Sequence, residues 1–183
     1  PEMAACFTLV RVIDEENRTL SFGEHAFAGL FDKENRSRTE WLSFFFREGN
    51  CLCHPSVLIR STAYADYNLS PRGLTSLPDF YIWVRLAMHA SFFILLEPLT
   101  IMRAHGDENT SAATKENGYR LQIECYQAIF PLFRQLSEED FLAVFPEAMA
   151  YVKQEGFLQD FAYAQILLSD GRKFAQLYGY DLL

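Results

Sequence analysis

The stretch 80–96 constrains the fold of this chain more than any other part of it. Its first apolar residues recur at i, i+3, i+4, i+7 and i+8, which predicts a helix with one apolar face. These residues are Phe80, Trp83, Val84, Ala87 and Met88. Residues 92–96 follow as an unbroken apolar run. So short and uniform a run predicts a strand covered on both faces, as in a parallel or mixed sheet. A helix that returns to a buried strand indicates an α/β fold.

The segments before this stretch predict further elements of the same α/β part. Residues 6–13 are apolar and β-branched and predict a strand. Thr39 is placed to cap a helix that ends at Gly49. Residues 51–59 are nearly all apolar and predict a second buried strand, in which Pro55 marks an irregularity or an edge.

Two connecting segments precede the helix that Asp79 opens. Residues 61–67 predict a short helix. Residues 68–77 contain Pro71 and Gly73 and predict a loop. Because this loop leads directly to Asp79, we expect it to form one wall of a pocket.

The pattern becomes helical after residue 115. Residues 116–136, 138–154 and 156–168 show helical spacing, and 172–183 predict a short last helix. Pro131 and Pro146 are expected to kink or end their helices. We therefore expect a mixed α/β part at 1–114 and a C-terminal helical segment at 115–183.

The composition excludes several classes of protein. The chain has 183 residues, of which 50% are hydrophobic and 15% aromatic, so disorder is not expected. The net charge is −8, and the absence of a Lys/Arg cluster argues against nucleic acid and anionic membranes as partners. No segment reaches the ~18 apolar residues that span a bilayer. The four cysteines lack the spacing of a disulfide scaffold, which favours reduced thiols in the cytoplasm.

Asp79 has two interpretations on residue type and spacing. The run Ser76-Leu77-Pro78-Asp79 is similar to a capping box, and the helix dipole favours an acidic residue in the first turn. Alternatively, a carboxylate at a helix start can serve as a base in a cleft, because α/β proteins place their chemistry at helix starts and strand ends.

Two other groups of polar residues raise the question of chemistry. Cys51-x-Cys53-His54 suggests zinc, but a structural zinc site needs four ligands and no second pair is present. Buried core cysteines are the favoured interpretation. Arg103-Ala-His105 follows the predicted buried strand and is either a solvated loop or part of a site. No glycine-rich phosphate loop and no Gly-x-Ser-x-Gly turn occurs.

Taken in order, residues 6–111 resemble the C-terminal, acceptor-side half of a family-two glycosyltransferase with a GT-A fold, which is a Rossmann-like α/β fold. The resemblance lies in the order and spacing of short motifs. These are Gly49-Asn50, Pro55-Ser-Val-Leu-Ile-Arg60, Asp79-Phe-Tyr-Ile-Trp-Val-Arg-Leu-Ala87, Glu97-Pro98-Leu99, Arg103-Ala-His105 and Asn109-Thr-Ser111. The helical segment 115–183 lies outside it.

The resemblance implies roles for four residues. Asp79 matches the general base that takes the proton of the acceptor hydroxyl, as that oxygen attacks the anomeric carbon of a nucleotide-sugar with inversion. A positioned base contributes about 10²–10⁴-fold to the rate. Arg103 and His105 match a loop that closes over the donor diphosphate, and Asn50 matches a substrate-binding position. Many relatives carry Glu-Asp at the base, whereas Pro78 precedes Asp79 here.

The resemblance also implies groups that this chain lacks. The complete enzyme would hold a divalent metal, Mn or Mg, through an Asp-x-Asp motif upstream of the strand at 6–13. This sequence contains no Asp-x-Asp. We therefore expect the chain to be a segment of a longer enzyme and, alone, to bind no metal and to turn over no nucleotide-sugar.

The expected setting is a cytoplasmic or membrane-peripheral enzyme of cell-surface polysaccharide synthesis. Its substrates would be a nucleotide-sugar donor and a sugar or lipid-linked acceptor. The alternative is a non-catalytic protein-interaction or sugar-binding module, in which Asp79 only caps a helix and the helical segment docks a protein partner.

Overall fold

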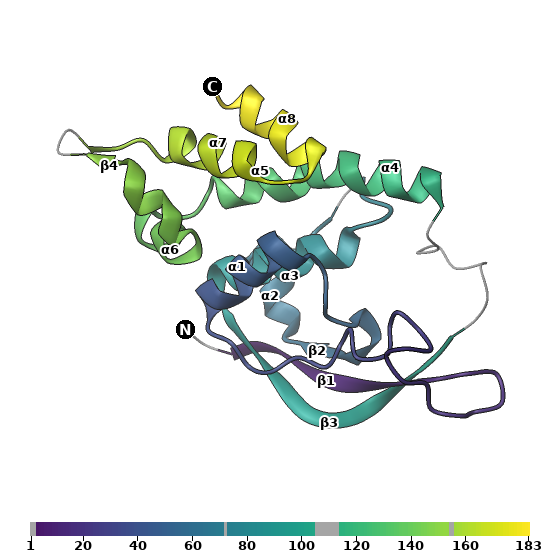
Figure 1. Ribbon diagram of the computed structural model, residues 1–183. Helices are drawn as coiled ribbons and strands as arrows, with labels where there is room; N and C mark the ends of the chain where they lie inside the picture. Colours follow the sequence, from purple (N-terminus) through teal and green to yellow (C-terminus); the bar gives the residue numbers. More distant parts are fainter. Residues whose placement is uncertain (1–2, 72, 105–113, 154–155) are drawn as a thin grey trace. The chain divides into compact units, whose positions relative to one another are not determined.

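A computed structural model describes residues 3–71, 73–104, 114–153 and 156–183 (Figure 1). Over these residues the protein is a mixed α/β structure with a three-stranded sheet, a two-stranded sheet and eight α-helices. The chain divides into two compact units. Unit 1 comprises Pro1–Arg72 and Pro78–Ala112, and unit 2 comprises Gly73–Leu77 and Ala113–Leu183. No helix in the described ranges combines the length and the apolar character needed to cross a membrane.

Unit 1 is built on a mixed sheet with the strand order β2-β1-β3. Its elements in chain order are β1 (Met3–Ile13), α1 (Arg38–Glu48), the 3₁₀ turn η1 (His54–Ser56), β2 (Val57–Ile59), α2 (Ser61–Asp66), α3 (Pro78–His89) and β3 (Ser91–Arg103). β2 is antiparallel to β1, whereas β3 is parallel to it. A parallel pair requires a crossover connection, and α1 and α3 lie within it. These two helices pack together on one face of the sheet (Figure 1).

Aromatic rings form the core between this face and the helices. The ring of Phe7 on β1 contacts that of Trp83 on α3, with centroids 4.8 Å apart. The ring of Trp41 on α1 lies 5.1 Å from that of Phe92 on β3. All five residues of the apolar stripe predicted for 80–88 are buried, which confirms the predicted helix and its buried face.

The predicted strand at 92–96 is confirmed in type but not in length or burial. β3 continues to Arg103. Phe93 and Leu96 expose 45% and 59% of their surface, so the prediction of a strand covered on both faces was wrong. The pairing with β1 shifts register between Thr8 and Val10, opposite a stretch of β3 that contains Pro98. Proline has no N–H for the ladder, which explains why it lies at this interruption.

Two local predictions also need correction. Only Val57–Ile59 of the predicted strand 51–59 is extended. Pro55 lies near the start of the preceding 3₁₀ turn, where a missing N–H costs little. Ser37, not Thr39, caps α1, because Ser37 and Glu40 form a complete capping box. The predicted end of that helix at Gly49, with a φ of 83°, is confirmed.

Unit 2 is mainly helical. Its elements are α4 (Lys115–Glu124), the π-helical segment η2 (Cys125–Ile129), α5 (Phe130–Phe133), α6 (Glu138–Val144), the 3₁₀ segment η3 (Pro146–Tyr151), β4 (Val152–Lys153), β5 (Gly156–Phe157), α7 (Gln159–Ser169) and α8 (Lys173–Asp181). The expected break at Pro146 within the helical run 138–154 is confirmed, because α6 ends at Val144 and Pro146 begins the 3₁₀ segment η3. Tyr163 lies at the centre of this unit and donates a hydrogen bond from its hydroxyl to the Phe130 carbonyl oxygen, 3.1 Å away.

Candidate functional site

Asp79 lies in the first turn of α3, directly after Pro78. Proline suits the first helical position, and the partial positive charge at a helix start stabilises a carboxylate there. The Asp79 Oδ1 atom accepts a hydrogen bond from the Phe80 backbone N–H, 2.7 Å away. Asp79 is half-buried.

Asn50 holds the other oxygen of this carboxylate. Its Nδ2 donates a hydrogen bond to Asp79 Oδ2 over 3.0 Å. Its own Oδ1 accepts a hydrogen bond from the Leu52 N–H at 3.2 Å, which fixes the amide in one orientation. The structure thus brings together two of the four residues that the resemblance selects. A carboxylate has about four lone-pair positions, and these two bonds use one on each oxygen.

The negative charge of Asp79 acts on a buried cysteine near this pair. Burial raises the pKa of the Cys53 thiol, and the negative charge of Asp79 raises it further. Cys53 is therefore within electrostatic range of the carboxylate. Burial also raises the pKa of Cys51 to about 12, so both thiols are protonated near neutral pH. All four cysteines of the chain are free thiols.

Arg103, the last residue of β3, is bound to the turn that follows β1. Its Nη1 donates to the Asp14 carbonyl oxygen at 2.6 Å and to the Glu15 carbonyl oxygen at 3.2 Å, and its Nη2 donates to Asn17 Oδ1 at 2.8 Å. These three bonds hold the guanidinium group against this turn. The phosphate role of Arg103 stays a prediction, and His105 lies outside the described residues.

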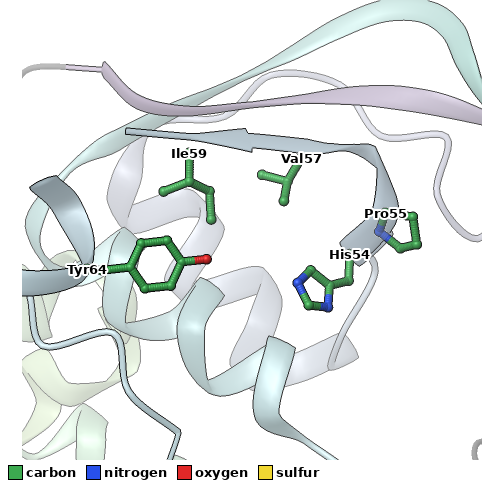
Figure 2. Close-up of a pocket in the computed structure, with 5 residues that line it drawn as sticks. All are labelled: His54, Pro55, Val57, Ile59 and Tyr64. Atoms are coloured by element: carbon green, nitrogen blue, oxygen red, sulfur yellow. The ribbon is translucent and has the colours of Figure 1, made fainter. Parts of the chain in front are cut away.

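A hollow of about 430 Å³ opens on unit 1 (Figure 2). Its lining comes from η1, β2 and α2, and comprises His54, Pro55, Val57, Ile59 and Tyr64. The His54 ring packs edge-on against the ring of Trp83, with centroids 5.7 Å apart. The sequence drew attention to His54 only as a zinc candidate, and nothing in the sequence pointed to Tyr64.

Sequence reasoning also missed Glu124, the last residue of α4. Glu124 is 6% exposed, and its carboxylate accepts backbone N–H bonds from three consecutive residues of the loop 73–77. These donors are Thr75, Ser76 and Leu77, at 2.8–3.1 Å. The π-helical segment η2 begins directly after it. Since Leu77 precedes the first residue of α3, Glu124 fixes the loop that leads to Asp79.

The residues present do not fit the divalent metal that the resemblance implies. The sequence has no Asp-x-Asp. Across the described ranges, no group of three or more His, Cys, Asp or Glu side chains is arranged to hold a metal ion. No step of the proposal below is therefore assigned to a metal in this chain.

Comparisons with family models, with characterised proteins and with solved structures found no match to this chain.

Proposed function

We propose that unit 1 is the acceptor-side part of an inverting glycosyltransferase with a GT-A fold, and that Asp79 is its general base. One observation carries this proposal. The resemblance selects Asn50 and Asp79 separately, 29 residues apart, and their side chains meet in a 3.0 Å hydrogen bond at a helix start. A helix cap alone does not require an asparagine on the far oxygen.

The arrangement suits proton abstraction from a sugar hydroxyl. Asn50 and the Phe80 N–H fix the plane of the Asp79 carboxylate while a lone pair on each oxygen stays available. An acceptor hydroxyl whose oxygen lies within about 2.6–3.2 Å of a carboxylate oxygen would transfer its proton to Asp79 as that hydroxyl oxygen attacks the anomeric carbon. The nucleoside diphosphate leaves from the opposite face, which inverts the configuration.

The topology of unit 1 supports the same proposal. β3, which carries Glu97-Pro98-Leu99 at its interruption, runs parallel to β1, and β2, which ends at Ile59, runs antiparallel to it. The described motifs from Pro55 to Arg103 therefore belong to one sheet and to the helices of unit 1, and Asn109-Thr-Ser111 lies outside the described residues. The nucleotide-sugar donor, its metal and a cytoplasmic location stay predictions.

The test is the Asp79→Asn variant in the longest natural reading frame that encodes this chain. Transfer from a panel of nucleotide-sugars is measured with manganese or magnesium present. We expect kcat to fall by about 10²-fold or more, because the amide cannot accept the proton. The free energy of unfolding should fall by only about 1 kcal/mol, since the amide oxygen can still accept the Phe80 N–H, whereas its NH₂ replaces the oxygen that accepts the Asn50 bond. Glu116→Gln, an acidic residue in the first turn of α4, is the matched control and should leave kcat unchanged.

A non-catalytic module is the second candidate, and the bond from the Phe80 N–H to Asp79 Oδ1 favours it. In that case Asp79 only stabilises the start of α3. Asp79→Ala would then cost about 1 kcal/mol of stability, as for a lost cap, and no transfer activity would exist to be lost.

A further inference from the structure

The hollow beside η1 has a fixed frame. The Ser56 Oγ donates a hydrogen bond to the Cys53 carbonyl oxygen at 2.8 Å, which locks the 3₁₀ turn that carries His54. The pairing of Val57 and Ile59 with β1 holds the strand that follows. Figure 2 shows Tyr64 and His54 on opposite sides of the hollow, with Val57 and Ile59 between them. The site is therefore preformed.

The lining is amphipathic, and none of the described residues that form it is a Lys, Arg, Asp or Glu. Tyr64 exposes 46% of its surface and offers a ring face and a hydroxyl. His54 adds an exposed imidazole, and Pro55, Val57 and Ile59 add apolar surface. The face of an aromatic ring is electron-rich and attracts the weakly positive C–H groups of a sugar ring, whose hydroxyls need hydrogen-bond partners. The volume also falls within the range of about 300–1,000 Å³ typical of small-molecule sites.

The hollow and Asp79 are connected through α3. Trp83, whose ring contacts His54, follows Asp79 by four residues on α3, which is about 6 Å along a helix axis. His54 also directly follows Cys53, and the Asp79 charge raises the pKa of the Cys53 thiol. The hollow is therefore linked to the helix of the candidate base through the contact of His54 with Trp83.

We propose that the hollow between His54 and Tyr64 binds a neutral pyranose ring of the acceptor saccharide. The binding of a sugar ring rests on the hollow alone, whereas its identity as the acceptor rests on the proposed function. The absence of charge from the lining disfavours the nucleotide diphosphate as the occupant. Tyr64 supplies the ring face, and His54, positioned by Trp83, supplies a hydrogen bond to a ring hydroxyl.

The test is titration of the isotope-labelled chain with neutral disaccharides of glucose, galactose and N-acetylglucosamine, followed by NMR. We expect shifts at residues 54–64 for at least one of them. Tyr64→Ala should weaken that binding by about fivefold or more, and Tyr64→Phe should retain most of it, because the ring contact persists. Leu58→Ala is the matched control. Leu58 lies between Val57 and Ile59 but outside the hollow's lining, and it is 78% exposed.

The inference is overturned if no disaccharide shifts these residues, or if Leu58→Ala weakens binding as much as Tyr64→Ala. Preferential binding of a tyrosine- and proline-containing peptide at the same residues also overturns it. The two proposals fail separately. If Tyr64→Ala transfers sugar with an unchanged KM for the acceptor, the hollow is not the acceptor site, but Asp79 can still be the base. If saccharides bind at the hollow and Asp79→Asn keeps full transfer activity, Asp79 is not the base, but the sugar site stands.

Discussion

Replacing Glu124 should release the loop that leads into α3. Its carboxylate accepts hydrogen bonds from three backbone N–H groups and is nearly inaccessible to solvent. In Glu124→Ala the Leu77 N–H is left buried without its acceptor, which costs about 1–3 kcal/mol. The half-buried Ser76 N–H adds about 1 kcal/mol, and Thr75 is exposed enough to turn to water. The expected loss of stability is therefore about 2–4 kcal/mol.

Glu124→Gln should have a smaller effect of the same sign. The amide retains one acceptor oxygen but sets an NH₂ donor against backbone donors and removes the charge, so we expect about half the loss. Urea denaturation followed by circular dichroism measures both variants. Glu116→Gln, on the exposed side of the same helix, is the control and should stay within about 0.5 kcal/mol of the parent chain.

Hydrogen exchange locates the effect. The Leu77 and Ser76 amides should exchange about 30-fold faster or more in Glu124→Ala, because their protection comes from the Glu124 carboxylate. The reasoning is refuted if both Glu124 variants unfold at the urea concentration of Glu116→Gln and the exchange of these two amides is unchanged.

Three further predictions test the packing and the electrostatics. Gly179→Ala should destabilise by about 1–2 kcal/mol in urea, because its Cβ would lie 3.1 Å from both the Ala164 carbonyl oxygen and the Leu167 Cβ. Gly118→Ala, with open space around its Cβ, should instead stabilise by about 0.5–1 kcal/mol, and equal effects would contradict the packing of α8 on α7. Cys51, with its pKa raised to about 12 by burial, should carry about a thousandfold less thiolate at about pH 8 than an ordinary thiol. Thiol labelling mapped by mass spectrometry should then reach Cys51 only in urea, and rapid labelling of Cys51 itself in the native chain would refute its burial. The Arg18 guanidinium, with Ser21, lowers the pKa of Glu24 from 4.5 to about 2. Since the folded pKa is the lower one, this contribution to stability is present above about pH 4.5 and is lost as the pH falls towards 2. An NMR titration that places the Glu24 pKa near 4.5 would rule the interaction out.

The sequence pattern correctly predicted features that neighbouring residues specify, such as the helix α3 and the end of α1. The apolar stripe of 80–88 predicts α3, and its burial follows because a helix with such a face must cover it. Gly49 ends α1 at a positive φ that glycine adopts without strain. Pattern failed where two local signals compete. Both Ser37 and Thr39 can cap a helix, and Glu40 decides for Ser37 because it returns a hydrogen bond to the Ser37 backbone N–H.

Whether a strand is buried depends on which other elements cover its two faces. The apolar sequence of 92–96 therefore predicted more burial than the structure shows. Residues 92–96 are all apolar, yet Phe92 and Ile94 are buried on one face while Phe93, on the opposite face, is exposed. Leu96 lies where the pairing with β1 is interrupted, and it is exposed as well. Likewise, the apolar run 51–59 contains a 3₁₀ turn, since Pro55 cannot join a ladder.

By itself, the sequence determined an α/β part built around one amphipathic helix, a mainly helical C-terminal segment, and Asp79 at a helix start. Tertiary structure alone decided the partner of that carboxylate and the anchor of the loop that precedes it in the chain. The bond from Asn50 to Asp79 spans 29 residues and the bond from Leu77 to Glu124 spans 47, and neither pair has a local signature. Such contacts form only when helices and strands pack at fixed distances, and that packing depends on the whole chain.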